Sequence, residues 1–129
     1  MEQKSITAAQ ILRAAKLKEE QARIEWRGLH ITVKHFLPLE AIQPMLAGIL
    51  ELCAAGEEHM FKPELLEFSI RAHVLLWYTN IELPKDLPQQ YQLAMGTDLY
   101  YAVAEHVCRD QLADLRRCAE LCCEAIMAG

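Results

Sequence analysis

The chain has 129 residues, 53% hydrophobic and 24% charged, and its 18 acidic and 13 basic residues leave a net charge of −5. This length and composition are typical of one globular domain with its own core, and they exclude an intrinsically disordered chain. The negative charge, the scattered Lys and Arg residues and the lack of any apolar run near ~18 residues make us expect neither a nucleic-acid partner nor a membrane.

The first predicted element is a helix over residues 8–23. Ser5 and Thr7 are good N-cap residues, and nearly all the residues that follow are strong helix formers. The apolar side of this helix is thin, with Ile11, Leu12 and Ala15 as its best members. We therefore expect a single domain over residues 1–129 in which residues 1–22 are only loosely attached.

Residues 24–33 replace the helical period by an alternation of apolar and polar residues, which predicts a β-hairpin. If Arg27 and Gly28 form a two-residue loop, Trp26 faces Leu29 and Ile24 faces Ile31, so that one side of the hairpin is apolar. The type of turn stays open, because arginine is a poor choice for a positive φ.

The helical period returns from Leu39 and runs to Cys53, with a plausible stop at Ala55-Gly56. Pro44 should kink this helix or mark the start of its regular part. The apolar positions that predict the helix are Leu39, Ile42, Met45, Leu46, Ile49, Leu50 and Cys53.

Residues 63–78 predict a largely buried helix at the centre of the domain. Pro63 suits the first helical position, and Glu64 and Glu67 suit the first turn. The apolar residues form two adjoining stripes, an arc too wide for a surface helix. Because the helix is buried, Arg71 and His73 are interpreted first as structural residues.

The last third of the chain predicts three more helices. A short helix over residues 87–95 is followed by one over residues 99–107, and Asp110 is expected to cap the final helix. The fold class is therefore mainly α, a small domain of about five helices with one β-hairpin near the N-terminus.

Two features of this last third form a candidate interface. Tyr100 and Tyr101 follow each other on one helix, so they cannot both face the same core. The final helix carries apolar residues at alternating spacings of three and four, which predicts a seam against another helix of this chain or of a second copy. The seam consists of Leu112, Leu115, Ala119, Cys122 and Ile126.

The five cysteines, an odd number without an export signal, predict reduced and buried thiols in a cytosol. Cys118 and Cys122 stand one turn apart, with His106 and Cys108 upstream, but no four-ligand spacing for zinc is present. Cys122 on the predicted seam is better interpreted as a small hydrophobic residue. No nucleotide-binding, hydrolase or metalloprotease motif occurs. We therefore expect no enzyme activity, no cofactor and no metal ion.

Three stretches of the chain carry a resemblance: EWRGLHITVKHFLPLEAI, FSIRAHVLLWYTNIELP and YQLAMGTDLYYAVAEHV. Over residues 24–107 they are similar to a family of small uncharacterised proteins of tailed phages and prophages of Gram-positive gut bacteria. Its recurring features here are Trp26-Arg27-Gly28, Ile70-Arg71, Leu83-Pro84 and Thr97-Asp98. The resemblance implies an accessory or virion-assembly protein without enzyme activity, and it does not cover residues 1–22 or the cysteine-rich final helix.

Two functions are therefore expected. The first is a phage-encoded protein that acts by protein–protein contact in virion or tail assembly, in the host cytoplasm or in the virion. The alternative is a small inhibitor of a bacterial anti-phage defence protein, comparable to an anti-CRISPR protein. The partner is accordingly a phage structural protein or a host defence protein, and a homodimer through the final helix is the further option.

Overall fold

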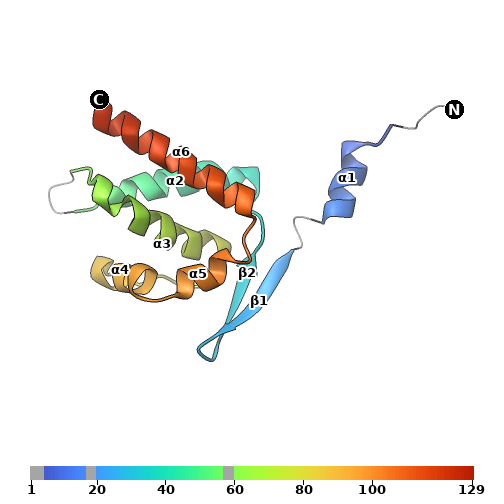
Figure 1. Ribbon diagram of the computed structural model, residues 1–129, viewed down its shortest axis with the longest axis horizontal. Coiled ribbons are helices and arrows are strands. Elements are labelled where there is room, and N and C mark those ends of the chain that lie inside the picture. The colour runs from blue at the N-terminus through green and yellow to red at the C-terminus, as the bar shows by residue number, and fades with distance from the viewer. Residues whose placement is uncertain (1–4, 17–19, 57–59) are drawn as a thin grey trace.

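The computed structural model describes residues 5–16, 20–56 and 60–129. Within these residues the chain forms six α-helices and one antiparallel β-hairpin, which confirms the predicted mainly α fold (Figure 1). A short 3₁₀ turn, Pro63–Leu65, leads directly into the third helix. The elements are α1 (Ala8–Ala15), β1 (Gln21–Trp26), β2 (Leu29–Lys34), α2 (Leu39–Cys53), α3 (Leu66–Tyr78), α4 (Leu87–Gly96), α5 (Leu99–Ala104) and α6 (Arg109–Ala128).

Helix α1 is shorter than predicted. Its start is fixed by Thr7, whose Oγ1 accepts a hydrogen bond from the Gln10 amide at 3.1 Å while the Gln10 side chain accepts one from the Thr7 amide at 2.9 Å. Lys16 ends the helix in the left-handed region, with φ of 52°. The prediction of a helix to residue 23 was wrong, because Gln21 to Arg23 pair with β2, and pairing within the fold outweighs helix propensity.

The predicted hairpin register is confirmed. Ile24 pairs with Ile31 and Trp26 pairs with Leu29. Arg27 and Gly28 have φ of 49° and 82°, so both central residues of the turn are left-handed, as a type I′ turn requires. Arginine rarely adopts this backbone, and its side chain lies over the Trp26 ring, 4.6 Å from the centroid.

The hairpin tip is attached to the residue before α5. The Trp26 Nε1–H donates a hydrogen bond to Asp98 Oδ1 at 2.9 Å, and Arg27 Nη2 lies 3.5 Å from the same oxygen. Two of the features that carry the resemblance, Trp26-Arg27-Gly28 and Thr97-Asp98, are therefore in contact although they are about 70 residues apart.

Helix α3 is the centre of the fold, as predicted. It packs against α2, α4, α5 and α6, and eight of its thirteen residues are buried. At its end, Thr79 forms a β-bridge with Val33 of β2, and the Asn80 side chain accepts a hydrogen bond from the Thr32 amide at 3.1 Å. The hairpin and the helical body are thus joined through both the tip and β2.

Helix α2 begins at Leu39 and continues through Pro44, so the proline does not mark its start. Its buried residues recur at every fourth position, Ala41, Met45, Ile49 and Cys53. Leu39 was included in the predicted apolar set, but its side chain is 84% exposed. The first turn of α2 therefore presents leucine to the surface.

The last two helices differ slightly from their predicted bounds. Helix α5 ends at Ala104 instead of residue 107, and α6 is preceded by Cys108, so Asp110 lies in the first turn and is not the cap. The Cys108 amide donates a hydrogen bond to the His35 carbonyl at 2.8 Å, which holds the chain where α6 begins.

Gln111 of α6 joins the connection between β2 and α2 to the end of α3. Its Oε1 accepts hydrogen bonds from the Leu37 amide at 2.8 Å and the Tyr78 hydroxyl at 2.6 Å, and its Nε2 donates to the Leu37 carbonyl at 2.9 Å. One side chain of α6 therefore satisfies the backbone between β2 and α2 and the end of α3.

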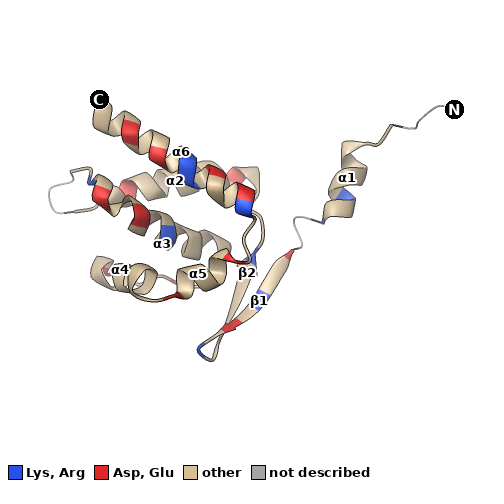
Figure 2. Ribbon diagram, viewed as in Figure 1, with Lys and Arg blue, Asp and Glu red and all other residues tan. Residues whose placement is uncertain are grey.

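Charged residues are distributed over the elements, and Lys and Arg do not gather on any one of them (Figure 2). In the part of the chain that the structure describes, no helix combines the length and the apolar character needed to cross a membrane.

Candidate interaction surface

Helix α5 points its two tyrosines in different directions, one into the core and one to the surface. Tyr100 is buried in the core, whereas the Tyr101 side chain is 57% exposed. The two rings are edge-on, with centroids 5.5 Å apart and planes at 72°. The prediction that both cannot face the same core is confirmed, and Tyr101 is the one available to a partner.

A network of charged residues holds these tyrosines in place. Arg116 of α6 forms a bidentate ion pair with Glu67 of α3, with both N···O distances 2.8 Å. Arg116 also donates a hydrogen bond to the Tyr100 hydroxyl at 2.8 Å. Arg71 donates to Glu67 at 2.9 Å and to the Tyr101 hydroxyl at 2.9 Å. We call Glu67, Arg71, Tyr100, Tyr101 and Arg116 the Tyr101 cluster.

The arginines of the Tyr101 cluster also contact the aromatic rings. The Arg71 guanidinium lies 5.0 Å from the Tyr100 centroid and 4.9 Å from the Tyr101 centroid. Two guanidinium groups therefore share one carboxylate and two rings, an arrangement that combines ion pairing with cation–π contact. The cluster carries one more positive than negative charge.

The ion pairs shift the pKa values within the cluster. Hydrogen bonds from Arg116 lower the pKa of Glu67, although partial burial acts in the opposite direction. The hydrogen bond with Glu67 likewise raises the pKa of Arg116. Glu67 is thus a carboxylate and Arg116 a cation throughout the neutral range, so the Tyr101 ring has a fixed, charged support.

Replacing Glu67 by Gln should lower the free energy of unfolding by about 1 kcal/mol near neutral pH, since the carboxylate pairs with two arginines but is 44% exposed and screened by solvent. The pKa of Glu67 is lowered by folding from its ordinary 4.5, so this stabilisation is present above that value and is lost as the pH falls through the lowered pKa.

Urea unfolding of Glu67→Gln and the unmodified protein, at about pH 7 and about pH 3, measures this effect. The difference between the two proteins should shrink at the lower pH. Glu64→Gln, which removes an exposed carboxylate three residues earlier, is the matched control and should show a smaller difference. An equally large difference at both pH values would contradict the ion-pair interpretation.

The predicted seam of α6 is partly internal. Leu115 and Ala119 are buried and Leu112 is half-buried, because α6 packs against α2 and α3 of the same chain. The seam does not continue to Cys122, which is exposed, or to Ile126, and the buried row instead runs on to Cys123. The buried residues of α6 keep a four-residue spacing, from Leu115 through Ala119 to Cys123, so the seam within this chain ends at Ala119. A contact of Cys122 and Ile126 with a second copy stays a prediction.

The structure therefore divides the predicted interface residues. Tyr100, Leu115 and Ala119 are core residues, whereas Tyr101, Cys122 and Ile126 reach the surface. The interface residues predicted from the sequence did not include Glu67, Arg71 or Arg116. The four-residue spacing of Glu67 and Arg71 on one helix was a usable signal. No local pattern indicates Arg116, which is 49 residues from Glu67.

All five cysteines are free, but they are not all buried as predicted. Cys53 and Cys123 are buried, and Cys122 is exposed. Burial raises the pKa of Cys53 to about 11, so this thiol stays protonated and unreactive near neutral pH. Among the residues that the structure describes, no three His, Cys, Asp or Glu side chains come together as ligands for a metal ion.

Comparisons with known proteins add no family to these observations. No protein-family model, curated protein or solved structure matches the chain. The likeness to phage proteins that the residues suggest stays a prediction.

Proposed function

We propose that the chain is a non-enzymatic protein that acts by binding another protein through Tyr101. The observation that carries this proposal is the exposed Tyr101 ring, which is fixed by Arg71 of the Tyr101 cluster. The Arg71 guanidinium donates a hydrogen bond to the Tyr101 hydroxyl and makes a cation–π contact with the ring. Tyrosine and arginine are enriched at the energetic centres of interfaces, where a ring fixed in advance loses little entropy on binding.

The likeness to phage proteins supports a more specific proposal, a role in virion or tail assembly in the bacterial host. The partner would then be a phage structural protein. Purified particles and tails should retain the protein, and deletion of its gene should reduce the yield of complete particles. Particle assembly that is untouched by the deletion would remove this proposal.

The contribution of Tyr101 can be tested on the same particles. Tyr101→Ala should weaken retention at least ~30-fold, the effect of losing a central aromatic anchor worth about 2 kcal/mol. Tyr101→Phe keeps the ring and loses only the hydroxyl that Arg71 contacts, so it should retain most of the binding. Equal retention of both variants and the unmodified protein would mean that the partner binds elsewhere.

The net charge of −5 favours a second candidate, an inhibitor that binds a basic surface of a host defence protein. Plaque formation separates the two candidates. If the protein is an inhibitor, deletion of its gene should reduce plating only on hosts that carry the intact defence system. If it is an assembly protein, the deletion should reduce plating on all hosts.

A further inference from the structure

Helix α1 carries an apolar face that is exposed. All described residues of α1 are exposed, and the helix projects from the helical body (Figure 1). Ala8, Ile11, Leu12 and Ala15 lie on one face, where Leu12 is 62% exposed, and Gln10 and Arg13 lie on the opposite face. An eight-residue helix is marginal in water unless an apolar surface covers it.

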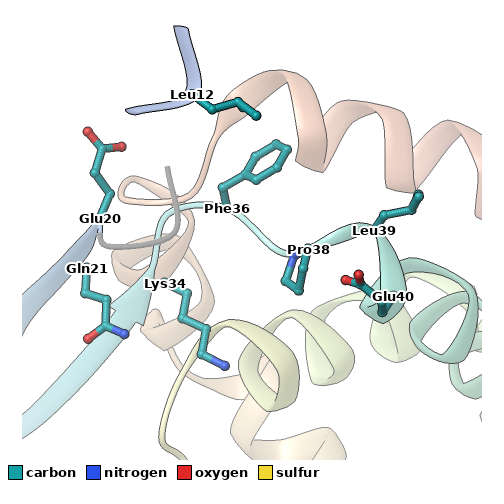
Figure 3. Close-up of a pocket in the computed structure, with 8 residues that line it drawn as sticks. All are labelled: Leu12, Glu20, Gln21, Lys34, Phe36, Pro38, Leu39 and Glu40. Carbon is teal, nitrogen blue, oxygen red and sulfur yellow. The ribbon is translucent and has the colours of Figure 1, made fainter. Parts of the chain in front are cut away.

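The helical body has an apolar surface that is also uncovered. Phe36, in the connection between β2 and α2, and Leu39, the first residue of α2, line two adjoining hollows. One, of about 530 Å³, lies between these residues and Leu12 (Figure 3). The other, of about 960 Å³, extends over Ile42 to the first turns of α6.

Leu12 only approaches the edge of this surface within its own chain. It lines the smaller hollow together with Phe36 and Leu39, yet Leu12 and Leu39 both remain more than half exposed. The larger hollow, between α2 and α6, includes no residue of α1 among those that line it. Within the described residues, both apolar faces therefore remain largely exposed in one copy.

The net charges of α1 and of the larger hollow have opposite signs. The described stretch of residues 5–16 contains Arg13 and Lys16 and no acidic residue (Figure 2). The larger hollow is lined by Asp110, Asp114 and Arg117, and Asp114 pairs with Arg117 at 2.9 Å. With the apolar face of α1 inward, Arg13 points to solvent, and Lys16 at the end of the helix is the cation that can approach Asp110.

We propose that α1 of one copy docks, apolar face inward, in the hollow between α2 and α6 of a second copy. A two-fold symmetric dimer makes this contact twice, because each copy supplies one α1 helix and one hollow. The contact uses neither Tyr101 nor its arginine support. It is therefore independent of the proposed function, and either can fail without the other.

Light scattering on the full chain during gel filtration, over a range of concentrations, tests the dimer. The mass should be twice the 14.7 kDa of one chain. Leu12→Glu and Leu39→Glu should each weaken the dimer at least about tenfold, because a charge would be buried without a partner. Both side chains are exposed in one copy, so circular dichroism should show both variants folded.

Gln10→Glu is the matched control. It adds the same charge to the opposite face of α1, and glutamate at this position preserves the capping box with Thr7. This variant should remain dimeric.

Mixing Leu12→Glu with Leu39→Glu tests whether α1 of one copy binds the hollow of the other. Leu12→Glu keeps an intact hollow and Leu39→Glu keeps an intact α1, so the mixture should form a heterodimer through one intact contact, at concentrations where each variant alone is a monomer. A dimer insensitive to both substitutions would overturn the proposal. A monomer at all concentrations would also overturn the proposal. If Leu39→Glu increased the hydrogen exchange of α1 in that monomer, α1 would be covering the hollow of its own chain.

Discussion

Phe68→Ala should lower the free energy of unfolding by about 3–5 kcal/mol. The Phe68 side chain is only 2% exposed and lies in the first turns of α3, the helix that contacts four others. Its ring also meets the Tyr91 ring of α4 edge-on, with centroids 5.2 Å apart, and this contact disappears with the ring. Alanine would leave a cavity that the surrounding helices cannot fill completely.

Denaturant unfolding followed by circular dichroism measures this loss. Leu76→Ala is the control on the same helix, because Leu76 faces solvent and its truncation should cost less than about 1 kcal/mol. Phe68→Leu, which keeps most of the volume, should lie between the two and remains measurable if the alanine variant does not fold. A loss below about 1 kcal/mol for Phe68→Ala would show that α3 is not the buried centre.

The elements that could be predicted from the sequence are those with local causes. The alternation of residues 24–33 determined the hairpin register, and the wide apolar arc of residues 63–78 determined the central helix. The errors fall where distant contacts decide. Residues 21–23 have helix-forming side chains, but they pair with β2 because the apolar side of the hairpin, including Ala22 and Ile24, packs on the core.

The candidate site was less predictable than the fold. Adjacent tyrosines on a helix must point in different directions, so one exposed ring could be expected, but not which one. Arg116 joins the Tyr101 cluster only because α6 crosses α3 beside Glu67. The exposure of Leu39 has the same kind of cause, since helical periodicity gives the spacing of apolar residues and not the position of the neighbouring helices.

The second large effect concerns the contact between α2 and α3. A Cβ atom at Gly48 of α2 would lie 2.8 Å from Nε2 of His73, which is a buried residue of α3. The His73 ring cannot easily turn away, because its Nδ1 lies 2.7 Å from the Ser69 carbonyl oxygen, and a carbonyl can only accept a hydrogen bond. The Ser69 hydroxyl in turn donates to the Ile49 carbonyl at 2.6 Å, so the whole contact is fixed.

Gly48→Ala should therefore lower the free energy of unfolding by about 1–3 kcal/mol, because overpacking against the fixed ring outweighs the ~1 kcal/mol that alanine contributes within a helix. Gly96→Ala is the matched control. Gly96 ends α4, and its added Cβ would meet only Gln92 Cγ, at an ordinary 3.7 Å, so this variant should be neutral or slightly more stable.

Thermal and denaturant unfolding of the two variants in the same buffer gives the comparison. The sign of the effect is informative because helix propensity alone predicts that both substitutions stabilise the protein. Opposite signs would show that α2 approaches α3 closely at His73 and needs glycine there. If Gly48→Ala were as stable as Gly96→Ala, the two helices would be farther apart at this point, and His73 would not fill the space beside α2.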